Sequence, residues 1–395
     1  MKANLNTFAP SSARMSSDFH LPSFDSGAKI IVVGAGAFGG WTALSLLRKG
    51  FDVKLLDAWG PGNARSSSAD ETRVIRSTYG GNKTYFDLNV RALQLWKEYQ
   101  KLFNKRIFYD TGVLWLCYQD ETPLVDESIP FAESHNMPYQ RINLAALAER
   151  YPQINTADLH HAYYDPFGGY LLARQATQCV KELFVSEGGN YIQRNVSMPD
   201  KSGKGGIILS DRSRLRADAY VFACGSWLGQ LFPDVLSDQI TCSKQEVYYF
   251  GVPASVSESM ENLPVWVDVD GHDHYYGIPG NGYRGFKIGV DIRGEAFDPT
   301  HGERILTPKA LHRAREFLAH RFPHLKGAPL LEYRVCPYEN SADGNFVFDT
   351  LPGSENVFVL GGGSGHGFKH GPALGELVAD VLSGDRQAPP IFALR

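Results

Sequence analysis

The sequence has little of what marks a secreted, membrane-bound or nucleic-acid-binding protein. Its 395 residues include five cysteines, which stand far apart without a CxxC pair, so no disulfide framework is predicted. No apolar run approaches the roughly 20 residues needed to cross a bilayer. The formal net charge of −4 and the pI of about 6.3 leave no broad basic surface for nucleic acid. We therefore expect a cytoplasmic protein without membrane or nucleic-acid partners.

Metal-binding signatures are also missing. There is no HExxH pattern and no coherent group of Cys, His and carboxylate residues, so no metal is predicted. Residues 1–28 are rich in Ser, Ala and Pro and lack the apolar core of a signal peptide, which predicts a flexible N-terminal arm. The remaining composition, with 43% hydrophobic and 21% charged residues, is that of a globular protein long enough for two or three domains.

The chain after this arm begins with a strand, a turn, a helix and a second strand. The β-branched run 29–33 ends at Gly34 and predicts a buried parallel strand. Apolar residues recur at helical spacing over 37–48, and residues 53–57 predict the next strand. This order is that of a βαβ unit, whose crossover should be right-handed.

Later segments repeat or vary these patterns. The runs 219–225 and 356–363 again lead from a buried strand into glycine. Alternating residues at 112–118 and 265–269 predict half-buried antiparallel strands. Helices are predicted over 87–103, 174–185 and 372–381.

These elements predict a mixed α/β fold, in which a discontinuous Rossmann-like nucleotide-binding domain is combined with a substrate domain that has an antiparallel sheet and helices. The expected boundaries are 29–112, 166–239 and 344–395 for the nucleotide domain, and 113–165 and 240–343 for the substrate domain.

A GxGxxG pattern stands between the first predicted strand and helix. Gly34 permits the tight turn, Gly36 leaves room for a pyrophosphate, and Gly39 lets helix and strand approach closely; Phe38 lies in the same loop. Backbone amides and the helix dipole at this point favour phosphate charge. Asp57 ends the second strand, where a carboxylate accepts a hydrogen bond from an adenosine ribose hydroxyl, which disfavours NADP. The pattern predicts FAD or NAD binding.

Further motifs resemble those of the monomeric sarcosine oxidase family of flavin-dependent amine oxidases. The segment ADETRVIR at 69–76 corresponds to the family's GDTRIIR. More family motifs follow in order: YYGIP at 275–279, KIG at 287–289, CPY at 336–338 and GSGHGFK at 363–369. The resemblance extends from about residue 29 to about residue 384.

This resemblance implies FAD as the cofactor of a monomer or small homo-oligomer. The implied reaction oxidises the C–N bond of a small, carboxylate-bearing and usually secondary amine or amino acid. A hydride equivalent passes to flavin N5, the imine product leaves, and O2 reoxidises the flavin with release of hydrogen peroxide.

The resemblance also implies roles for individual residues. Arg76 and Lys369 match the positions that hold the substrate carboxylate, and two cations converging on an anion would orient its Cα–N bond toward the flavin. Lys287 matches a lysine over the flavin, where a fixed ammonium stabilises nascent superoxide. Cys336 matches the cysteine that tethers the flavin at its 8α-methyl carbon. Surface ion pairs and a small core cysteine are the ordinary alternatives.

Other implied site residues have less distinct roles. Arg73 matches a catalytic arginine close to the flavin, and Thr72 precedes it. His366 is a candidate catalytic residue, or a histidine with a structural hydrogen bond. Tyr338 and Tyr276 are expected to shape the substrate cavity, with packed core aromatics as the alternative.

Glycine-dense backbone near the end of the chain is suited to lie against an isoalloxazine ring, and amides at the start of the next helix would stabilise negative charge on the reduced ring. The remaining predicted cofactor contacts are Gly225, Trp227, Gly363, Gly365 and Gly367, together with Arg73, Thr72, His366 and Lys369.

The sequence departs from the family at several of these positions. Asp291 replaces a histidine close to the substrate, and Ser68 and Ala69 replace a pair of histidines near the flavin; Pro337 is also unusual. An anion at Asp291 favours a cationic or hydroxyl-bearing group on the substrate. N-alkyl amino acids, cyclic imino acids such as pipecolate and fructosyl amino acids are therefore all candidate substrates. Three alternative functions also stay open: a flavin dehydrogenase with another electron acceptor, an NAD-dependent dehydrogenase, and a flavoprotein scaffold without turnover.

Overall fold

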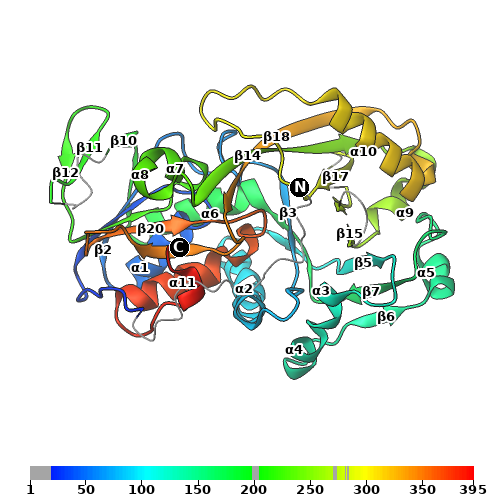
Figure 1. Cartoon of the computed structure of the whole chain (residues 1–395), viewed down its shortest axis with the longest axis horizontal. Coiled ribbons are helices and arrows are strands. Elements are labelled where there is room, and N and C mark those ends of the chain that lie inside the picture. The colour runs from blue at the N-terminus through cyan, green and yellow to red at the C-terminus, as the bar shows by residue number, and fades with distance from the viewer. Residues whose placement is uncertain (1–18, 198–203, 270–273, 281, 283) are drawn as a thin grey trace.

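The computed structural model describes residues 19–197, 204–269, 274–280, 282 and 284–395. Within these ranges the chain forms two adjoining parts, seen side by side in Figure 1. One part is built on a six-stranded, mainly parallel sheet, and the other on an eight-stranded, mainly antiparallel sheet. This arrangement confirms the predicted mixed α/β fold.

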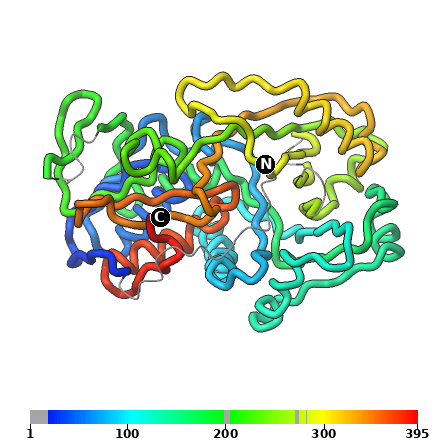
Figure 2. Tube along the Cα trace, viewed as in Figure 1, coloured from blue at the N-terminus to red at the C-terminus, as the bar shows by residue number. Residues whose placement is uncertain are grey.

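The parallel sheet is assembled from distant parts of the sequence. Its strands are, in spatial order, β19 (Val347–Thr350), β20 (Val357–Gly361), β13 (Ala219–Phe222), β1 (Lys29–Val33), β2 (Asp52–Asp57) and β9 (Asn190–Gln193). All neighbours pair in parallel except β19 with β20. Figure 2 accordingly shows the blue and red ends of the trace in the same part of the molecule. The predicted discontinuity is therefore present, whereas the exact domain boundaries stay a prediction.

The strands of this sheet are apolar on both faces, so each face must be covered by other elements. The helices named next pack together on one of these faces. α1 (Gly39–Arg48) packs against α6 (Ala173–Ser186) and α11 (Gly371–Leu382), and α11 in turn packs against α2 (Lys83–Leu102). The crossing of α1 and α11 is close because glycine stands there: a Cβ on Gly375 would lie 2.6 Å from the backbone carbon of Trp41.

The predicted helices are all present. α2 begins four residues before its predicted start, because Asn82 caps it by accepting a hydrogen bond from the backbone N–H of Tyr85 at 3.3 Å. Leu21, from the end of the predicted N-terminal arm, is buried, and Phe24 N–H donates to Leu382 O at 2.8 Å. Residues 1–18 of that arm lie outside the described residues.

The second part of the molecule is built on the eight-stranded sheet. Its strands are, in spatial order, β18 (Leu330–Ser341), β14 (Ile240–Phe250), β17 (Phe286–Val290), β16 (Tyr275–Ile278), β15 (Val265–Asp268), β5 (Val113–Cys117), β7 (His161–Asp165) and β6 (Gln140–Ile142). The helix α10 (Pro308–Arg321) packs through Ala314 and Leu318 into the same apolar cluster as Trp266 of β15.

Two strand predictions are confirmed in part. As expected, β5 pairs antiparallel with β7, and β15 pairs antiparallel with β16. However, β5 and β15 pair with each other in parallel, and every residue of β5 is buried, where a half-buried strand was expected. The reason is that β5 separates two apolar cores. Trp115 points into one cluster, whereas Leu114 and Leu116 point into the other. Successive side chains of this strand therefore point alternately into the two apolar cores, and neither face of the strand is exposed to solvent.

A small sheet joins the two parts of the molecule. β3 (Thr72–Ile75) pairs with β8 (Gly169–Leu172), and β8 pairs with β4 (Phe108–Tyr109). β3 follows the loop after β2 and precedes α2, so it carries the ADETRVIR motif between the sheets.

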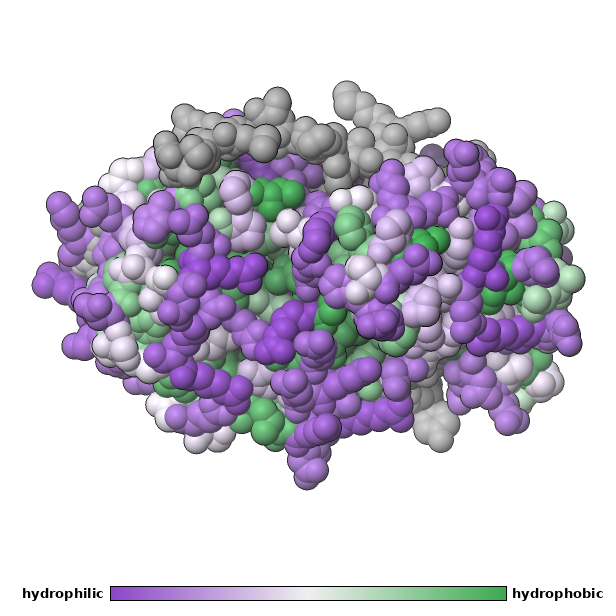
Figure 3. Space-filling view, turned by 90° about the horizontal axis from the view of Figure 1, so that it is seen from below, coloured by the Kyte–Doolittle hydropathy of each residue, from purple (hydrophilic) through white to green (hydrophobic). Residues whose placement is uncertain are grey.

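The surface of the described residues mixes polar and apolar side chains. On the face in Figure 3, apolar residues form small patches among polar ones. Within the described part of the chain, no helix is both long and apolar enough to span a bilayer. All five cysteines are free thiols.

Candidate functional site

A cleft opens at the carboxyl ends of β1, β13 and β20. This is the edge at which open parallel sheets bind their ligands. Its empty volume, which includes solvent at the open mouth, is about 1230 Å³. The cleft is lined by ten of the predicted cofactor contacts: Gly34, Gly36, Phe38, Asp57, Arg73, Gly225, Trp227, Gly363, Gly365 and Gly367.

The glycine loop fits a dinucleotide. A Cβ on Gly34 would lie 2.3 Å from Ala223 O, and one on Gly39 would lie 1.9 Å from Gly34 O, so neither position tolerates a side chain. Gly36 differs, because its nearest neighbour would be Ser68 Oγ at 3.7 Å. A side chain there would instead occupy the cleft beside the start of α1, where a phosphate is stabilised by amides and the helix dipole.

Asp57 fixes this loop while facing the cleft. Its Oδ2 accepts from Ala35 N–H at 2.8 Å, and its Oδ1 accepts from the backbone N–H groups of Trp59 and Gly60 at 2.9 and 2.7 Å. A carboxylate has about four lone-pair positions, which leaves capacity for a ribose hydroxyl. Trp59, which the sequence analysis missed, packs against Trp227 with ring centroids 5.0 Å apart at the same cleft.

A second cavity adjoins the cleft and holds the predicted substrate contacts. Its empty volume is about 760 Å³, and Arg73, Tyr338, Gly365 and Phe368 line both spaces. The other predicted residues on its wall are Arg76, Tyr276, Asp291, His366 and Lys369. The structure therefore brings together all four residues proposed to bind substrate, although they come from distant parts of the chain.

Two cations face this cavity. The Arg76 guanidinium lies 4.8 Å from the Tyr79 ring centroid and 5.3 Å from that of Trp115. Lys369 is only 3% exposed, and its Nζ donates to His366 O at 2.8 Å. Burial and the charge of Arg76 hold the pKa of Lys369 well below its ordinary value. An anion bound between these side chains would favour the ammonium form.

Asp291 provides an acidic group in the same cavity. Burial raises its pKa, against the opposing charges of Arg76, His274 and Lys369. A Cβ on Gly365 would lie 3.2 Å from Asp291 Oδ1, so the glycine leaves room for this carboxyl. The cavity thus presents two cations and one acid to a ligand.

His366 is held at both ring nitrogens. Nε2 lies 3.0 Å from Gly344 O and must donate to it, and Nδ1 lies 3.2 Å from the Tyr79 hydroxyl. Burial, together with Lys369, holds the pKa of His366 well below its ordinary value. These bonds provide a structural role for the neutral ring beside the cavity, and its catalytic role stays a prediction.

Lys287 lies outside the walls of both spaces. It is 1% exposed and forms an ion pair with Asp70. Its Nζ also donates to Thr72 O at 2.8 Å and to Thr72 Oγ1 at 3.3 Å. The predicted cofactor contact Thr72 is therefore a buried acceptor for Lys287 and does not line the cleft.

Asp70 connects these motifs, although the sequence analysis did not select it. Its carboxylate accepts from Arg73 Nη1 and from the Tyr249 hydroxyl, both at 2.6 Å, in addition to Lys287. Burial favours the neutral acid, but the charges of Lys287 and Arg73 outweigh this effect and hold the Asp70 pKa well below its usual range. In the sequence, the one sign of this role is that an acidic residue stands three positions before Arg73 in the same motif.

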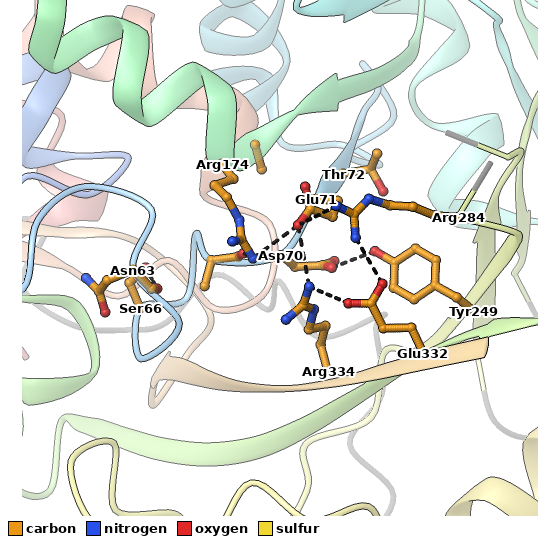
Figure 4. Close-up of polar contacts among 12 residues, drawn as sticks. Asn63, Ser66, Asp70, Glu71, Thr72, Arg174, Tyr249, Arg284, Glu332 and Arg334 are labelled. Atoms are coloured by element: carbon orange, nitrogen blue, oxygen red, sulfur yellow. Dashed lines mark hydrogen bonds and ion pairs between the residues drawn. The ribbon is translucent and has the colours of Figure 1, made fainter. Parts of the chain in front are cut away.

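The neighbouring Glu71 ties the same loop to both parts of the molecule. In Figure 4, three arginines point toward Glu71 from different elements. Arg174 of α6 lies 3.1 Å from Glu71 Oε1, while Arg284 and Arg334 lie 3.6 Å from it. Glu332 also pairs with Arg284 at 2.9 Å. The loop that carries Asp70 and Arg73 is thus held in place.

We expect Asp70→Ala to lower the free energy of unfolding by about 3–5 kcal/mol, because it leaves two buried cations without their carboxylate. Urea unfolding of the purified protein measures this loss. The matched control is Asp110→Ala, which removes an exposed partner of Arg106 and should cost less than about 1 kcal/mol. Equal losses in the two variants would show that the buried cluster does not stabilise the fold.

Comparison with known proteins now defines the class. The family model for FAD dependent oxidoreductases matches residues 29–381, so the chain belongs to that family. It is a FAD-dependent oxidoreductase, and the family supports FAD over NAD as the nucleotide.

Particular relatives narrow this class. The chain is 28% identical over 356 residues to monomeric sarcosine oxidase from Bacillus sp. (strain B-0618), covering 89% of this chain and 91% of that one. It is 28% identical over 359 residues to N-methyl-L-tryptophan oxidase from Salmonella dublin, covering 90% and 94%. These matches confirm the resemblance to the sarcosine oxidase family.

Solved structures show the same fold. L-proline dehydrogenase from P. horikoshii superimposes with a TM-score of 0.79 at 19% identity, covering 93% of this chain and 96% of that chain. Fructosamine oxidase from Aspergillus fumigatus (Amadoriase II) gives a TM-score of 0.75 at 19% identity, covering 93% and 89%. At these identities the likeness concerns the fold alone.

Proposed function

We propose that this protein is an oxidase that uses FAD to oxidise the C–N bond of a small, carboxylate-bearing secondary amine to an imine. The observation that carries the proposal is the placement of Arg76 and Lys369 on the cavity that adjoins the cofactor cleft. The relatives named above, which act on sarcosine and on N-methyl-L-tryptophan by their names, support this substrate class.

The chain's own residues bind and orient the substrate. Bound FAD would accept the hydride that leaves the carbon next to nitrogen while the nitrogen loses a proton, and O2 would then take up two electrons and two protons to give hydrogen peroxide. Arg76 and Lys369 hold the carboxylate by charge-assisted hydrogen bonds, which fixes the amine end toward the cleft. Tyr276 and Tyr338 form walls of the cavity and exclude water from the reacting bond.

Asp291 favours a substrate with a further polar group. Its carboxyl faces the cavity from the side of Gly365, so a hydroxyl or cationic substituent would find an acceptor there. This favours a hydroxylated N-substituent, as in a fructosyl amino acid, as the second candidate beside simple N-alkyl amino acids.

We also propose a covalent link between FAD and Cys336. Cys336 of β18 is buried and is not on the wall of the cleft, but its thiol interacts with Arg73, which lines the cleft. Burial and the Asp70 carboxylate raise the pKa of the Cys336 thiol, while the charges of Arg73 and Lys287 oppose that rise and favour the thiolate needed for bond formation.

Cys336→Ser should abolish the link. We expect flavin colour to stay with the acid-precipitated wild-type protein and to move to the supernatant for the variant. Cys179→Ser, which changes a buried thiol of α6, is the control and should behave as wild type. Colour retained in the Cys336→Ser pellet would exclude this attachment point.

Oxygen consumption tests the function as a whole. N-alkyl, cyclic and fructosyl amino acids would be supplied aerobically, each beside its carboxamide, while oxygen and peroxide are measured. We expect oxygen uptake with equimolar peroxide for at least one acid and not for its amide. Reduction of an artificial dye without oxygen uptake would instead indicate a dehydrogenase.

Domain boundaries at 29–112, 166–239 and 344–395 for the FAD domain, a cytoplasmic location and a monomer or small homo-oligomer complete the proposal.

A further inference from the structure

A buried acid on the cofactor cleft has no place in the motifs described so far. Glu339 of β18 is 9% exposed and lines the cleft. Its Oε1 accepts from Gly363 N–H at 3.2 Å. Its Oε2 is enclosed and has no hydrogen-bond partner in the described part of the chain. A buried polar atom without a partner is costly, which suggests that a ligand completes this site.

The position of Oε2 places that ligand beside the glycine loop. A Cβ on Gly225 would lie 3.7 Å from Oε2, and one on Gly361 would lie 3.3 Å from it. Gly225 follows β13, and a Cβ on Gly34 would lie 3.4 Å from Cys224 Cα. The carboxyl therefore stands at the ends of β13 and β20, next to the loop that is suited to a diphosphate.

The surroundings of Glu339 disfavour a charge. Among the described residues no lysine or arginine forms a salt bridge with it. The titratable groups that interact with it are the Cys224 thiol after β13 and the Cys242 thiol of β14. The other titratable groups on the wall of the same cleft are Asp57, Tyr338, Arg73 and Arg194. Burial raises the pKa of Glu339 to about 7, opposed by the Gly363 and Gly362 amides. Burial also raises the Cys242 pKa to about 11, so this thiol is neutral near pH 7.

We propose that Glu339 is a cofactor-contacting residue whose neutral carboxyl donates a hydrogen bond from Oε2 to an oxygen of the diphosphate or ribityl chain of FAD, so that cofactor binding takes up a proton. An ionised carboxylate would instead repel the diphosphate, and no lysine or arginine among the described residues forms a salt bridge with Glu339 that would neutralise its charge. This inference rests on the proposed FAD binding and assigns a further residue to it.

The sign of the pH dependence follows from linkage. Because the anionic cofactor binds the protonated form, its affinity falls as pH rises above the Glu339 pKa of about 7. One linked proton gives a dissociation constant that rises by up to about tenfold per pH unit.

The test measures FAD binding to the full chain carrying Cys336→Ser, so that binding is reversible. Quenching of FAD fluorescence gives the dissociation constant at pH values from about 6 to about 9, a range that spans the Glu339 pKa of about 7. In this background we expect affinity to weaken above about pH 7, with uptake of about one proton per FAD in weak buffer at the upper end.

Three variants test whether the Glu339 carboxyl itself causes the pH dependence of FAD binding. Glu339→Gln keeps a donor that does not titrate, so binding should stay tight and lose its pH dependence. Glu339→Leu removes the donor, so binding at about pH 6 should weaken about tenfold, the equivalent of one hydrogen bond. Glu355→Gln, at an exposed position between β19 and β20 and outside the cleft, should keep the wild-type profile.

Unchanged pH dependence in Glu339→Gln, or no proton uptake by the Cys336→Ser chain, would overturn the inference while leaving FAD binding intact. Failure of every chain, including wild type, to bind FAD would overturn the proposed function as well.

Discussion

Replacement of Lys287 by methionine should slow the reaction of the reduced protein with oxygen by about 10²–10³-fold, while reduction by substrate changes by less than about tenfold. The magnitude is that of removing one preorganised charge or donor from a site that excludes water. The reason for the separation is location: Lys287 does not line the substrate cavity, and its charge acts on the cofactor cleft through Asp70, which also pairs with Arg73 on the wall of that cleft. Stopped-flow traces of the two half-reactions measure both effects.

The fold should tolerate this change. Asp70 keeps its hydrogen bonds from Arg73 and Tyr249, each at 2.6 Å, when the lysine is removed. Lys97→Met, at a cation over the Phe108 ring and away from both cavities, is the control and should alter neither half-reaction. Equal slowing of both half-reactions in Lys287→Met would contradict a specific role in oxygen activation.

Loss of either cavity cation should have a comparable effect on the first half of the reaction. Arg76→Met and Lys369→Met are each expected to lower kcat/KM for a carboxylate-bearing amine by about 10²–10³-fold. Removing one partner of a buried, hydrogen-bonded charge pair costs about 2–5 kcal/mol, and each 1.4 kcal/mol corresponds to a factor of ten.

The carboxamide of the same amine provides the internal comparison. Wild type should oxidise it poorly, and the two variants should oxidise it no more slowly than wild type does. Arg106→Met, which changes an exposed arginine just before β4 and outside both cavities, should leave the oxidation of both substrates unchanged. A uniform loss on acid and amide would mean that Arg76 and Lys369 support the cavity without recognising a carboxylate.

The parts of this account that follow from local backbone constraints were predictable. Gly34 and Gly39 are required by contacts with Ala223 and with Gly34 itself, and such a pattern between a strand and a helix has few structural solutions. The helices were predictable for a similar reason, because their apolar period reports burial on one face.

Interactions between distant residues were harder to predict. The role of Asp70 depends on its hydrogen bonds with Lys287, 217 positions away, and with Tyr249, 179 positions away. The pairing of β5 with β15 depends on two apolar cores that no single strand reveals. Glu339 stands in a strand whose sequence gives no sign that its side chain lines the cofactor cleft. These features depend on tertiary packing, which one sequence does not display.

The most direct test of the central claim is the visible spectrum of the purified protein during anaerobic titration with N-alkyl and fructosyl amino acids. The account predicts a yellow protein with about one flavin per chain, bleached by at least one carboxylate-bearing amine and coloured again on admission of oxygen. A colourless protein that takes up no flavin, or a flavin that no such amine bleaches, would contradict it.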